Sequence, residues 1–242
     1  MRIVHISDTH NFHGELTLPP CDVLIHSGDI GSRTHIQELV DFLRWFEMQP
    51  AKNKVWIAGN HDLCLDKEFM ARGTGFQRNY GLSKYHEALE LLEKYRVQYL
   101  CNASCIIEGH LFYGAPWSPS FHPKFWAFNK DRGAEIQKEW ARIPSDVEVL
   151  ITHTPPALIL DELDAAAGMI TPKEQRRGCA DLFQVIQKRL FKLKLHCFGH
   201  MHDNYGVQMR PVSRTRQMLF SNGAVLNNDY EILVTRPLII EI

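Results

Sequence analysis

Short apolar runs recur along the chain and are separated by longer amphipathic stretches. In each of five runs of five or six residues, at least half of the side chains are apolar, mainly Val, Ile and Leu. This pattern is typical of strands that are buried on both faces of a sheet. The predicted strands are residues 2–7, 22–27, 53–58, 147–152 and 194–198.

The stretches between these strands carry apolar residues at helical spacing. Thr34, with Gln37 three residues later, forms a candidate capping box for one helix, and Ser83 is the candidate cap of a second. The apolar faces of three predicted helices are formed by Ile36, Leu39, Val40, Leu43 and Phe46, by Tyr85, Ala88, Leu89, Leu92 and Tyr95, and by Leu182, Phe183, Ile186 and Leu190. Strands that alternate with helices in this way predict an α/β layered domain.

The C-terminal part of the chain has a different pattern. Residues 204–242 contain short strand-like segments joined by turns, without helices between them. We therefore expect a second, more antiparallel set of strands there. The chain has no Ser/Gly-rich linker, low-complexity segment or internal repeat, so we interpret residues 1–242 as a single domain.

Composition narrows the classes of function. Hydrophobic residues make up 45% and charged residues 23% of the 242 positions, which is ordinary for a folded globular protein. The formal net charge of −1 indicates no basic surface for duplex nucleic acid or an anionic membrane, so we expect neither as a partner. No apolar run approaches the roughly 18 residues of a membrane span, and the N-terminal residues reach Asp8 before a signal-peptide core can form.

Cysteine usage indicates a reducing compartment. The six cysteines are scattered, without the dense spacing of a disulfide scaffold. We therefore expect free thiols and a cytoplasmic location. Cys101 and Cys105 form a lone C-x-x-x-C pair, which we interpret as two packed thiols rather than zinc ligands.

Each of the five predicted strands is followed by side chains that can bind a metal ion or transfer a proton. They are Asp8 and His10, Asp29, the group Asn60, His61 and Asp62, His153, and finally His200 and His202. Singly, such residues are more typical of caps, turns or packed histidines. Together they are expected to converge, because the carboxyl ends of strands share one edge of an α/β sheet. Gly28, Gly59 and Gly199 would allow the sharp turns and close approach that such a site needs.

These residues form a set of motifs in a fixed order. The motifs are D-x-H at residues 8–10, G-D at 28–29, G-N-H-D at 59–62, His153 alone, and G-H-x-H at 199–202. The set resembles the calcineurin-like metallophosphoesterase superfamily, and the segment APWSPSFHPKFWAFNKDRG at residues 115–133 resembles its metallophosphoesterase-domain-containing branch. The resemblance implies a four-layer αββα sandwich of two mixed β-sheets flanked by helices, which agrees with the separate strand sets described above.

The resemblance also implies a centre for two divalent metal ions, with Asp29 bridging them. One ion would be held by Asp8, His10, Asp29 and His202, and the other by Asp29, Asn60, His153 and His200. Within the last motif, His200 and His202 would thus serve different ions, while Met201 points away from both.

The ligand types favour particular ions and a particular chemistry. Imidazole nitrogen with carboxylate and amide oxygen, without thiolate, suits Mn²⁺, which we expect first, or Fe²⁺, Zn²⁺ or Co²⁺. Two such ions can activate a bridging water as hydroxide and hold the phosphoryl oxygens for in-line displacement. Two dications offset by Asp8, Asp29 and a hydroxide leave a net charge of about +1, which would attract a phosphate ester.

Two further residues are candidates for proton transfer. His61 is not needed as a ligand, and the resemblance places it near the leaving-group oxygen. We therefore expect His61 to act as general acid or as a hydrogen-bond donor to the transition state. Asp62 is expected to orient the His61 ring.

A loop dense in aromatic residues is the best clue to the substrate. Between residues 117 and 132, aromatic side chains alternate with polar and basic ones, and the candidate substrate-binding residues are Trp117, His122, Trp126, Asn129 and Arg132. Such a loop could stack a nucleobase while Asn129 or Arg132 holds a phosphate or base edge. The alternative is that the aromatic rings only pack the loop onto the domain.

Three classes of function remain open. The leading hypothesis is a binuclear metal-dependent hydrolase of small phosphate mono- and diesters, with cyclic nucleotides or other phosphodiesters preferred. The alternative is a phosphoprotein phosphatase or nuclease with the same metal core. A binding or scaffold protein on this fold ranks lower, because every ligand position is filled. The sequence does not predict an oligomeric state.

Overall fold

The strands at the N-terminus form the first of two large sheets in the computed structural model, which describes residues 1–72, 81–121, 125–162, 177–234 and 237–242. The strand order in this sheet is β13-β1-β2-β3-β4, with β1 to β4 parallel and β13 antiparallel to β1. The strands are β1 (Arg2–Ile6), β2 (Cys21–His26), β3 (Ala51–Trp56), β4 (Gln98–Tyr99) and β13 (Leu238–Glu241).

The second sheet contains the remaining two predicted strands at its centre. Its order is β11-β12-β10-β9-β6-β5, in which β12, β10, β9 and β6 are parallel and the two edge strands are antiparallel to their neighbours. The strands are β5 (Ala103–Ile107), β6 (His110–Ala115), β9 (Val149–Thr152), β10 (Leu195–Phe198), β11 (Gly206–Pro211) and β12 (Gln217–Asn222). A short parallel pair, β7 (Ser118–Pro119) and β8 (Asn129–Lys130), lies apart from both sheets.

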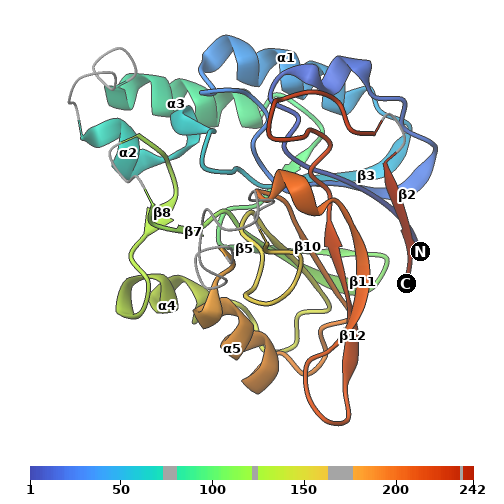
Figure 1. Cartoon of the computed structure of the whole chain (residues 1–242). Helices are drawn as coiled ribbons and strands as arrows, with labels where there is room; N and C mark the ends of the chain where they lie inside the picture. The colour runs from blue at the N-terminus through green and yellow to red at the C-terminus, as the bar shows by residue number, and fades with distance from the viewer. Residues whose placement is uncertain (73–80, 122–124, 163–176, 235–236) are drawn as a thin grey trace.

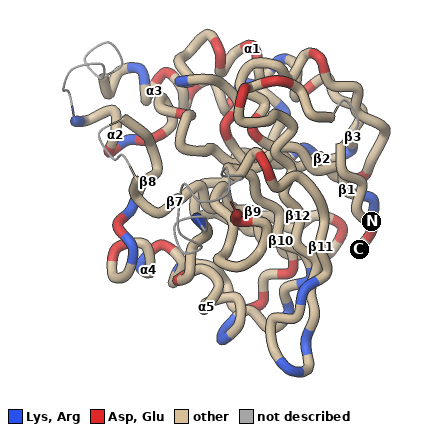
Figure 2. The backbone as a smooth tube through the Cα atoms, viewed as in Figure 1, with Lys and Arg blue, Asp and Glu red and all other residues tan. Residues whose placement is uncertain are grey.

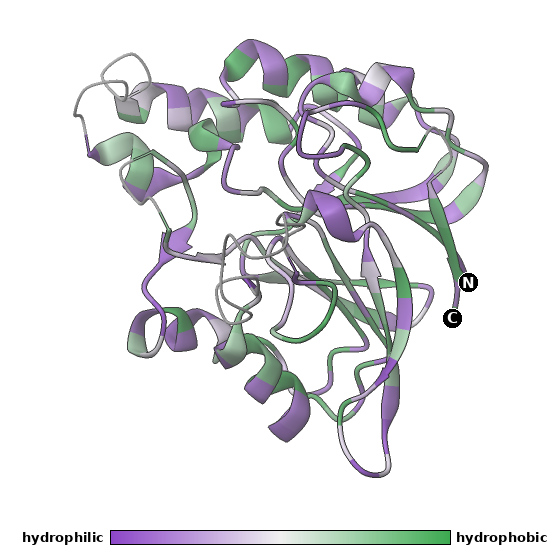
Figure 3. Cartoon of the chain, viewed as in Figure 1, coloured by the Kyte–Doolittle hydropathy of each residue, from purple (hydrophilic) through white to green (hydrophobic). Residues whose placement is uncertain are grey.

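The two sheets face each other across an apolar core. Ile3, Ile25 and Val55 from the first sheet belong to the same buried cluster as Phe112 and Ile151 from the second. Alternate residues on the same strands point the other way and are also buried, as the strand pattern predicted. Figure 3 shows the apolar strands inside and the more polar helix surfaces outside. Both faces of each sheet are therefore covered, and the predicted αββα sandwich is confirmed.

Helices cover the outer faces of the sandwich (Figure 1). The first sheet is covered by α1 (Ile36–Glu47) and α3 (Gly81–Leu92), with the short α2 (Lys67–Ala71) against α3. The second sheet is covered by α4 (Ala134–Trp140) and α5 (Ala180–Lys188), which pack on each other. Among the described residues, no helix combines the length and the apolar character needed to cross a membrane.

The helix caps differ from those predicted. The N-cap of α1 is His35, whose ring accepts from the Glu38 amide while the Glu38 carboxylate accepts from the His35 amide. Thr34 instead donates its hydroxyl to Asp62 at 2.6 Å, because that buried carboxylate lies within its reach. Ser83 lies inside α3, which already includes Gly81, and so does not cap it.

The C-terminal segment divides between the two sheets. The β11–β12 hairpin is antiparallel, as predicted, but β12 also pairs in parallel with β10 and so extends the second sheet. The last strand, β13, returns to pair with β1 in the first sheet. Figure 2 shows acidic and basic residues interspersed over most of the backbone, with basic residues gathered at the tip of the β11–β12 hairpin.

Candidate metal centre

Seven candidate ligands lie on the loops that follow β1, β2, β3, β9 and β10. The sequence led us to expect that all of these ligands lie at the edge of a single sheet. In the structure, β1, β2 and β3 belong to one sheet, and β9 and β10 belong to the other. The carboxyl ends of both sets meet at the same end of the sandwich, and this brings the seven side chains together. They are Asp8, His10, Asp29, Asn60, His153, His200 and His202.

The side chains fall into two compact groups. Ligand atoms of Asp8, His10 and His202 lie within 4.8 Å of one another, and so do those of Asp29, His153 and His200. Asp29 lies between the groups, because its Oδ2 is 3.9 Å from His10 Nε2 and 3.2 Å from His153 Nε2. The two histidines of the G-H-x-H motif thus lie in different groups.

Asn60 adds an amide oxygen to the second group. Its Oδ1 lies 3.0 Å from His153 Nε2, and its side chain is buried. Met201, between the two histidines of its motif, is buried.

Backbone carbonyls hold three of the histidines in one orientation. The Nδ1 atoms of His10, His153 and His202 lie 3.1, 2.9 and 3.0 Å from the carbonyl oxygens of Gly31, Ser27 and Asn227. Because a carbonyl can only accept, each Nδ1 carries a proton, and each Nε2 faces the other candidate ligands, where it can donate a proton to a carboxylate or, once deprotonated, bind a metal ion. The contact of Asn227 with His202 comes from outside all of the sequence motifs.

The backbone at the site is strained. Asp8, His10, Asp29 and His200 have φ values of 53°, 40°, 59° and 69°, in the left-handed region that residues with a Cβ rarely adopt. Each such residue costs about 1–3 kcal/mol, which the surrounding structure must offset. Strain at four of the seven candidate ligands indicates that the chain is held in this form for a function.

Two glycines permit the close approach of the loops. A Cβ on Gly199 would collide with the Asp8 carboxylate and with the Ser7 hydroxyl. A Cβ on Gly59 would collide with the Asp29 carboxylate and, at 2.7 Å, with the His153 ring. The motif glycines are therefore required by packing at the site as well as by the turns.

The charges at the site favour a bound cation. Burial alone would raise the pKa of Asp8, but the hydrogen bond from His202 and the charge of His153 hold it below its ordinary range. Burial likewise opposes ionisation of Asp29, whose pKa is held well below normal by His153 and His61. Burial alone would lower the pKa values of His153 and His202. The nearby carboxylates outweigh this effect, so that Asp29 raises the pKa of His153 to about 9 and Asp8 raises the pKa of His202 to about 9.

The remaining imidazoles are neutral and suited to bind a metal. Burial lowers the pKa of His10 to about 4 and that of His200 to about 3. His10 Nε2 is buried and has no hydrogen-bond partner among the described residues, although it points toward Asp29. Ionised carboxylates beside neutral imidazoles with free lone pairs fit two divalent ions of the borderline class.

His61 lies at the mouth of this centre. Its ring centroid is 4.7 Å from that of His10 and 4.1 Å from that of Trp126, and its Nε2 is 4.0 Å from Asp29 Oδ2. Nδ1 lies 2.5 Å from the Ser32 carbonyl oxygen, so it carries a proton and leaves Nε2 facing the site. His61 is therefore placed to contact a substrate bound beside Asp29.

The role expected for Asp62 is corrected by the structure. Its carboxylate accepts hydrogen bonds from the backbone amides of Gly59, Asp29 and Ile30 at 2.7, 2.9 and 3.1 Å, and from the Thr34 hydroxyl. The His61 ring is oriented instead by Ser32 and Trp126. Asp62 thus ties the loop after β3 to the loop after β2. Burial and the nearby Asp29 raise its pKa to about 7, while the bonds from Thr34 and Gly59 act in the opposite direction.

The aromatic loop is mostly structural. Trp117 is buried, and its Nε1 donates to Asn102 Oδ1 at 2.9 Å. Asn129 is also buried and donates to the Ala127 carbonyl at 2.8 Å. The polar groups of these two residues hold the loop together, and their contact with substrate stays a prediction. His122 lies outside the described residues. Trp126 faces His61, as described above.

Arg132 lines a cavity of about 480 Å³ beside the second ligand group. The cavity wall also includes Phe121, Arg177, His200 and Met201. The Arg132 guanidinium donates to the carbonyls of Gly178 and Arg177, both at 3.1 Å, which fixes its position. Sequence reasoning missed Arg177, because no motif surrounds it.

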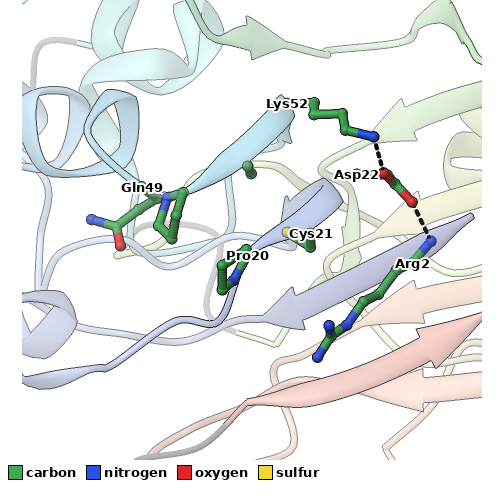
Figure 4. A pocket seen from close by; sticks show the side chains of 8 residues that line it. Arg2, Pro20, Cys21, Asp22, Gln49 and Lys52 are labelled. Carbon is green, nitrogen blue, oxygen red and sulfur yellow. Dashed lines mark hydrogen bonds and ion pairs between the residues drawn. The ribbon is translucent and has the colours of Figure 1, made fainter.

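A second hollow, of about 510 Å³, lies at the amino ends of the strands in the first sheet (Figure 4). There Asp22 accepts from the Arg2 amide at 2.8 Å and pairs with Lys52 at 2.5 Å. This hollow holds none of the candidate functional residues.

The fold and the centre define the class of protein: a four-layer αββα sandwich with paired metal-binding groups at the carboxyl ends of its strands. The family model of the calcineurin-like phosphoesterases matches residues 1–204. The chain therefore belongs to the calcineurin-like phosphoesterase family, as its motifs indicated.

Similar proteins are found in animals and bacteria. Human metallophosphoesterase domain-containing protein 1 is 34% identical over 248 residues, covering 100% of this chain and 71% of the human protein. A UPF0046 protein of Caenorhabditis elegans is 36% identical over 213 residues, covering 86% of this chain and 70% of that protein. The crystal structure of TT1561 from Thermus thermophilus matches with a TM-score of 0.56 at 10% identity, over 92% of this chain and 88% of that one, which shows a shared fold.

Proposed function

We propose that this protein is a binuclear metal-dependent hydrolase of small phosphate esters that prefers phosphodiesters, including cyclic nucleotides. One observation carries the proposal: the ligand atoms form two groups, each within 4.8 Å, and the buried Asp29 of the second group lies 3.9 Å from His10 of the first. Membership of the calcineurin-like phosphoesterase family supports the same reaction class.

The protein supplies the scaffold for the chemistry. Two divalent ions, with Mn²⁺ our first candidate, would polarise the phosphoryl oxygens and activate water as the nucleophile. Asp8, His10 and His202 would hold one ion, and Asn60, His153 and His200 the other, with Asp29 between them. The carbonyl contacts keep each Nε2 directed at the site, and His153 and His202 would release their Nε2 protons when a metal ion binds.

His61 is proposed to donate a proton to the leaving-group oxygen. Its Nε2 faces the site, and its Nδ1 is fixed at Ser32. When Nε2 is protonated, it can donate a hydrogen bond to an oxygen bound beside Asp29. The Trp126 ring, tilted by 35° with its centroid 4.1 Å away, limits the rotation of His61 and so keeps Nε2 in this direction.

The cavity beside His200 would hold the part of the substrate that carries the leaving-group oxygen. Arg132 and Arg177 provide two positive charges there, and the Phe121 ring provides an apolar wall, with its centroid 5.6 Å from that of the His200 ring. The nucleoside part of a nucleotide, with its aromatic base, matches this combination. The cavity thus supports a nucleotide-like substrate over a simple alkyl ester.

The test is metal replacement followed by a substrate comparison. Protein stripped with chelator and reloaded with Mn²⁺ should hydrolyse bis-p-nitrophenyl phosphate and a cyclic nucleotide faster than a phosphopeptide. Asp29→Asn, which keeps the size of the side chain, is the control and should reduce turnover to background. Turnover of the phosphopeptide alone would favour the phosphoprotein phosphatase alternative. Metal binding without any turnover would favour a binding protein.

A further inference from the structure

A tight turn in the C-terminal segment lies against the first ligand group. Within this turn, residues 227–231, Asn227 Oδ1 accepts from the amides of Asp229 and Glu231 at 3.0 and 2.8 Å, and the Asn227 carbonyl accepts from the Tyr230 amide at 3.0 Å. The Asn227 amide donates to the Glu231 carbonyl at 2.9 Å. Four hydrogen bonds across five residues make the turn rigid.

The turn contacts the metal centre at two points. The Asn227 carbonyl accepts from His202 Nδ1 at 3.0 Å. The Tyr230 ring lies edge-on to both histidines of the first group, with its centroid 4.9 Å from that of His10 and 5.6 Å from that of His202. The turn begins well after residue 204, where the match to the family model ends.

The backbone of Tyr230 is held in an unfavourable conformation. Its φ of 61° lies in the left-handed region, which a bulky residue almost never adopts without a compensating constraint. The ring is nevertheless 43% exposed, so burial of the side chain does not account for the strain. This backbone conformation places the Tyr230 ring against His10 and His202.

His10 is enclosed between two rings in this arrangement. His61 lies edge-on at 4.7 Å and Tyr230 at 4.9 Å, with interplanar angles of 81° and 76°. His10 also contacts the His202 ring, with centroids 5.3 Å apart, and its Nδ1 contacts the Gly31 carbonyl. Without the Tyr230 ring, His10 and His202 would each keep their carbonyl contact but lose the packing on one side, and water could reach them from that side.

We propose that Tyr230 is a positioning residue, whose ring fixes the imidazoles of His10 and His202 so that both Nε2 atoms face the ion held with Asp8. This inference rests on the proposed metal centre. It concerns the first ligand group, because the ring contacts of Tyr230 are with His10 and His202, while His153 and His200 contact each other. The phenolic hydroxyl is not required for this role.

The experiment is a titration of chelator-stripped protein with Mn²⁺, in which calorimetry measures the number and affinity of the bound ions. Wild type should bind two equivalents. Tyr230→Ala should weaken one of the two by about 10- to 100-fold, the range typical of lost support for a metal ligand. Tyr230→Phe, which keeps the ring, should stay within about threefold of wild type. Phe191→Ala, which removes an exposed ring at 68% exposure elsewhere, is the matched control.

The variant Tyr230→Gly distinguishes an effect of Tyr230 on metal affinity from an effect on the stability of the fold. Glycine adopts a φ of 61° without strain, so the metal-free variant should unfold at the same temperature as wild type or higher. It should still lose affinity for one ion as Tyr230→Ala does. A variant that lost both stability and affinity would show a general structural role and overturn the proposal.

The remaining outcomes are also decisive. If Tyr230→Ala bound both ions as tightly as wild type, the positioning role would be wrong while the proposed function stood. If Tyr230→Phe lost as much affinity as Tyr230→Ala, the hydroxyl rather than the ring would be responsible. If wild type bound no Mn²⁺ and hydrolysed no phosphate ester, the proposed function and this inference would fail together.

Discussion

Lowering the pH should destabilise the fold through histidines buried between the layers, and His196 on β10 is the clearest case. Its Nε2 lies 2.8 Å from the Thr152 hydroxyl oxygen, while that hydroxyl donates its own proton to the Thr154 carbonyl at 2.7 Å. His196 Nε2 must therefore be the donor. Its Nδ1 is buried and has no hydrogen-bond partner among the described residues. A second proton on this ring would be buried without an acceptor.

The magnitude follows from the pKa values. Burial lowers the pKa of His196 from 6.5 to about 3, and it lowers those of His5 and His26 to about 3 as well. Because the folded pKa is depressed, the unfolded chain binds protons first, so the stabilising effect is complete above pH 6.5 and is lost as the pH falls toward 3. Well inside this window each histidine costs about 1.4 kcal/mol of unfolding free energy per pH unit.

The assay is urea unfolding at pH 5.5 and 4.5, with wild type compared with His196→Gln. The glutamine amide can still donate to Thr152 but does not titrate. Between pH 5.5 and pH 4.5, the free energy of unfolding should therefore fall by about 1.4 kcal/mol less in the variant than in wild type. His86→Gln, at an exposed position on α3, is the matched control and should keep the wild-type slope. Equal slopes for wild type and His196→Gln would refute the reasoning that the buried ring resists protonation.

Two substitutions test the site itself. His61→Ala should lower kcat by about 10²- to 10⁴-fold while both Mn²⁺ equivalents remain bound, because this ring is proposed to donate a proton rather than to bind metal; loss of metal in the titration would contradict the assignment. Gly199→Ala should weaken Mn²⁺ binding by at least about tenfold, because the added Cβ displaces the Asp8 carboxylate. Gly14→Ala, where a Cβ meets nothing within 4 Å, is its control, and equal affinity of the two variants would show that the collision is harmless.

Local pattern was sufficient to predict five inner strands and the polar side chains that follow them. Residues 2–7, for example, are apolar on both faces, and β1 (Arg2–Ile6) is buried on both sides from Ile3 onward. The β5–β6 hairpin was not predicted, because only one face of β5 is buried and Ile106 is 73% exposed. A strand at the edge of a sheet lacks the continuous apolar signal that identified the central strands.

Roles set by distant partners could not be read from local sequence. Thr34 has the spacing of a helix cap, but it bonds to Asp62, which lies 28 residues further along the chain. Trp117 and Asn129 lie in an aromatic loop typical of ligand binding, yet both are buried by packing that depends on the whole fold. The local sequence did not indicate that Tyr230 contacts the candidate ligands. The preceding residues, Asn227, Asn228 and Asp229, indicate only a turn.

The carboxylates of the centre also connect its loops to one another. Asp8 accepts from the His200 amide at 2.9 Å, Asp29 accepts from the His61 amide at 2.8 Å, and Asp62 accepts from three amides on two loops. The bond to Asp8 joins loops of the two sheets, and the other bonds join the loops after β2 and β3. Together they help to hold the left-handed backbone at the ligands despite its cost. Since Asp8 accepts from the His200 amide, a carboxylate of the first ligand group also fixes the loop that carries both His200 and His202.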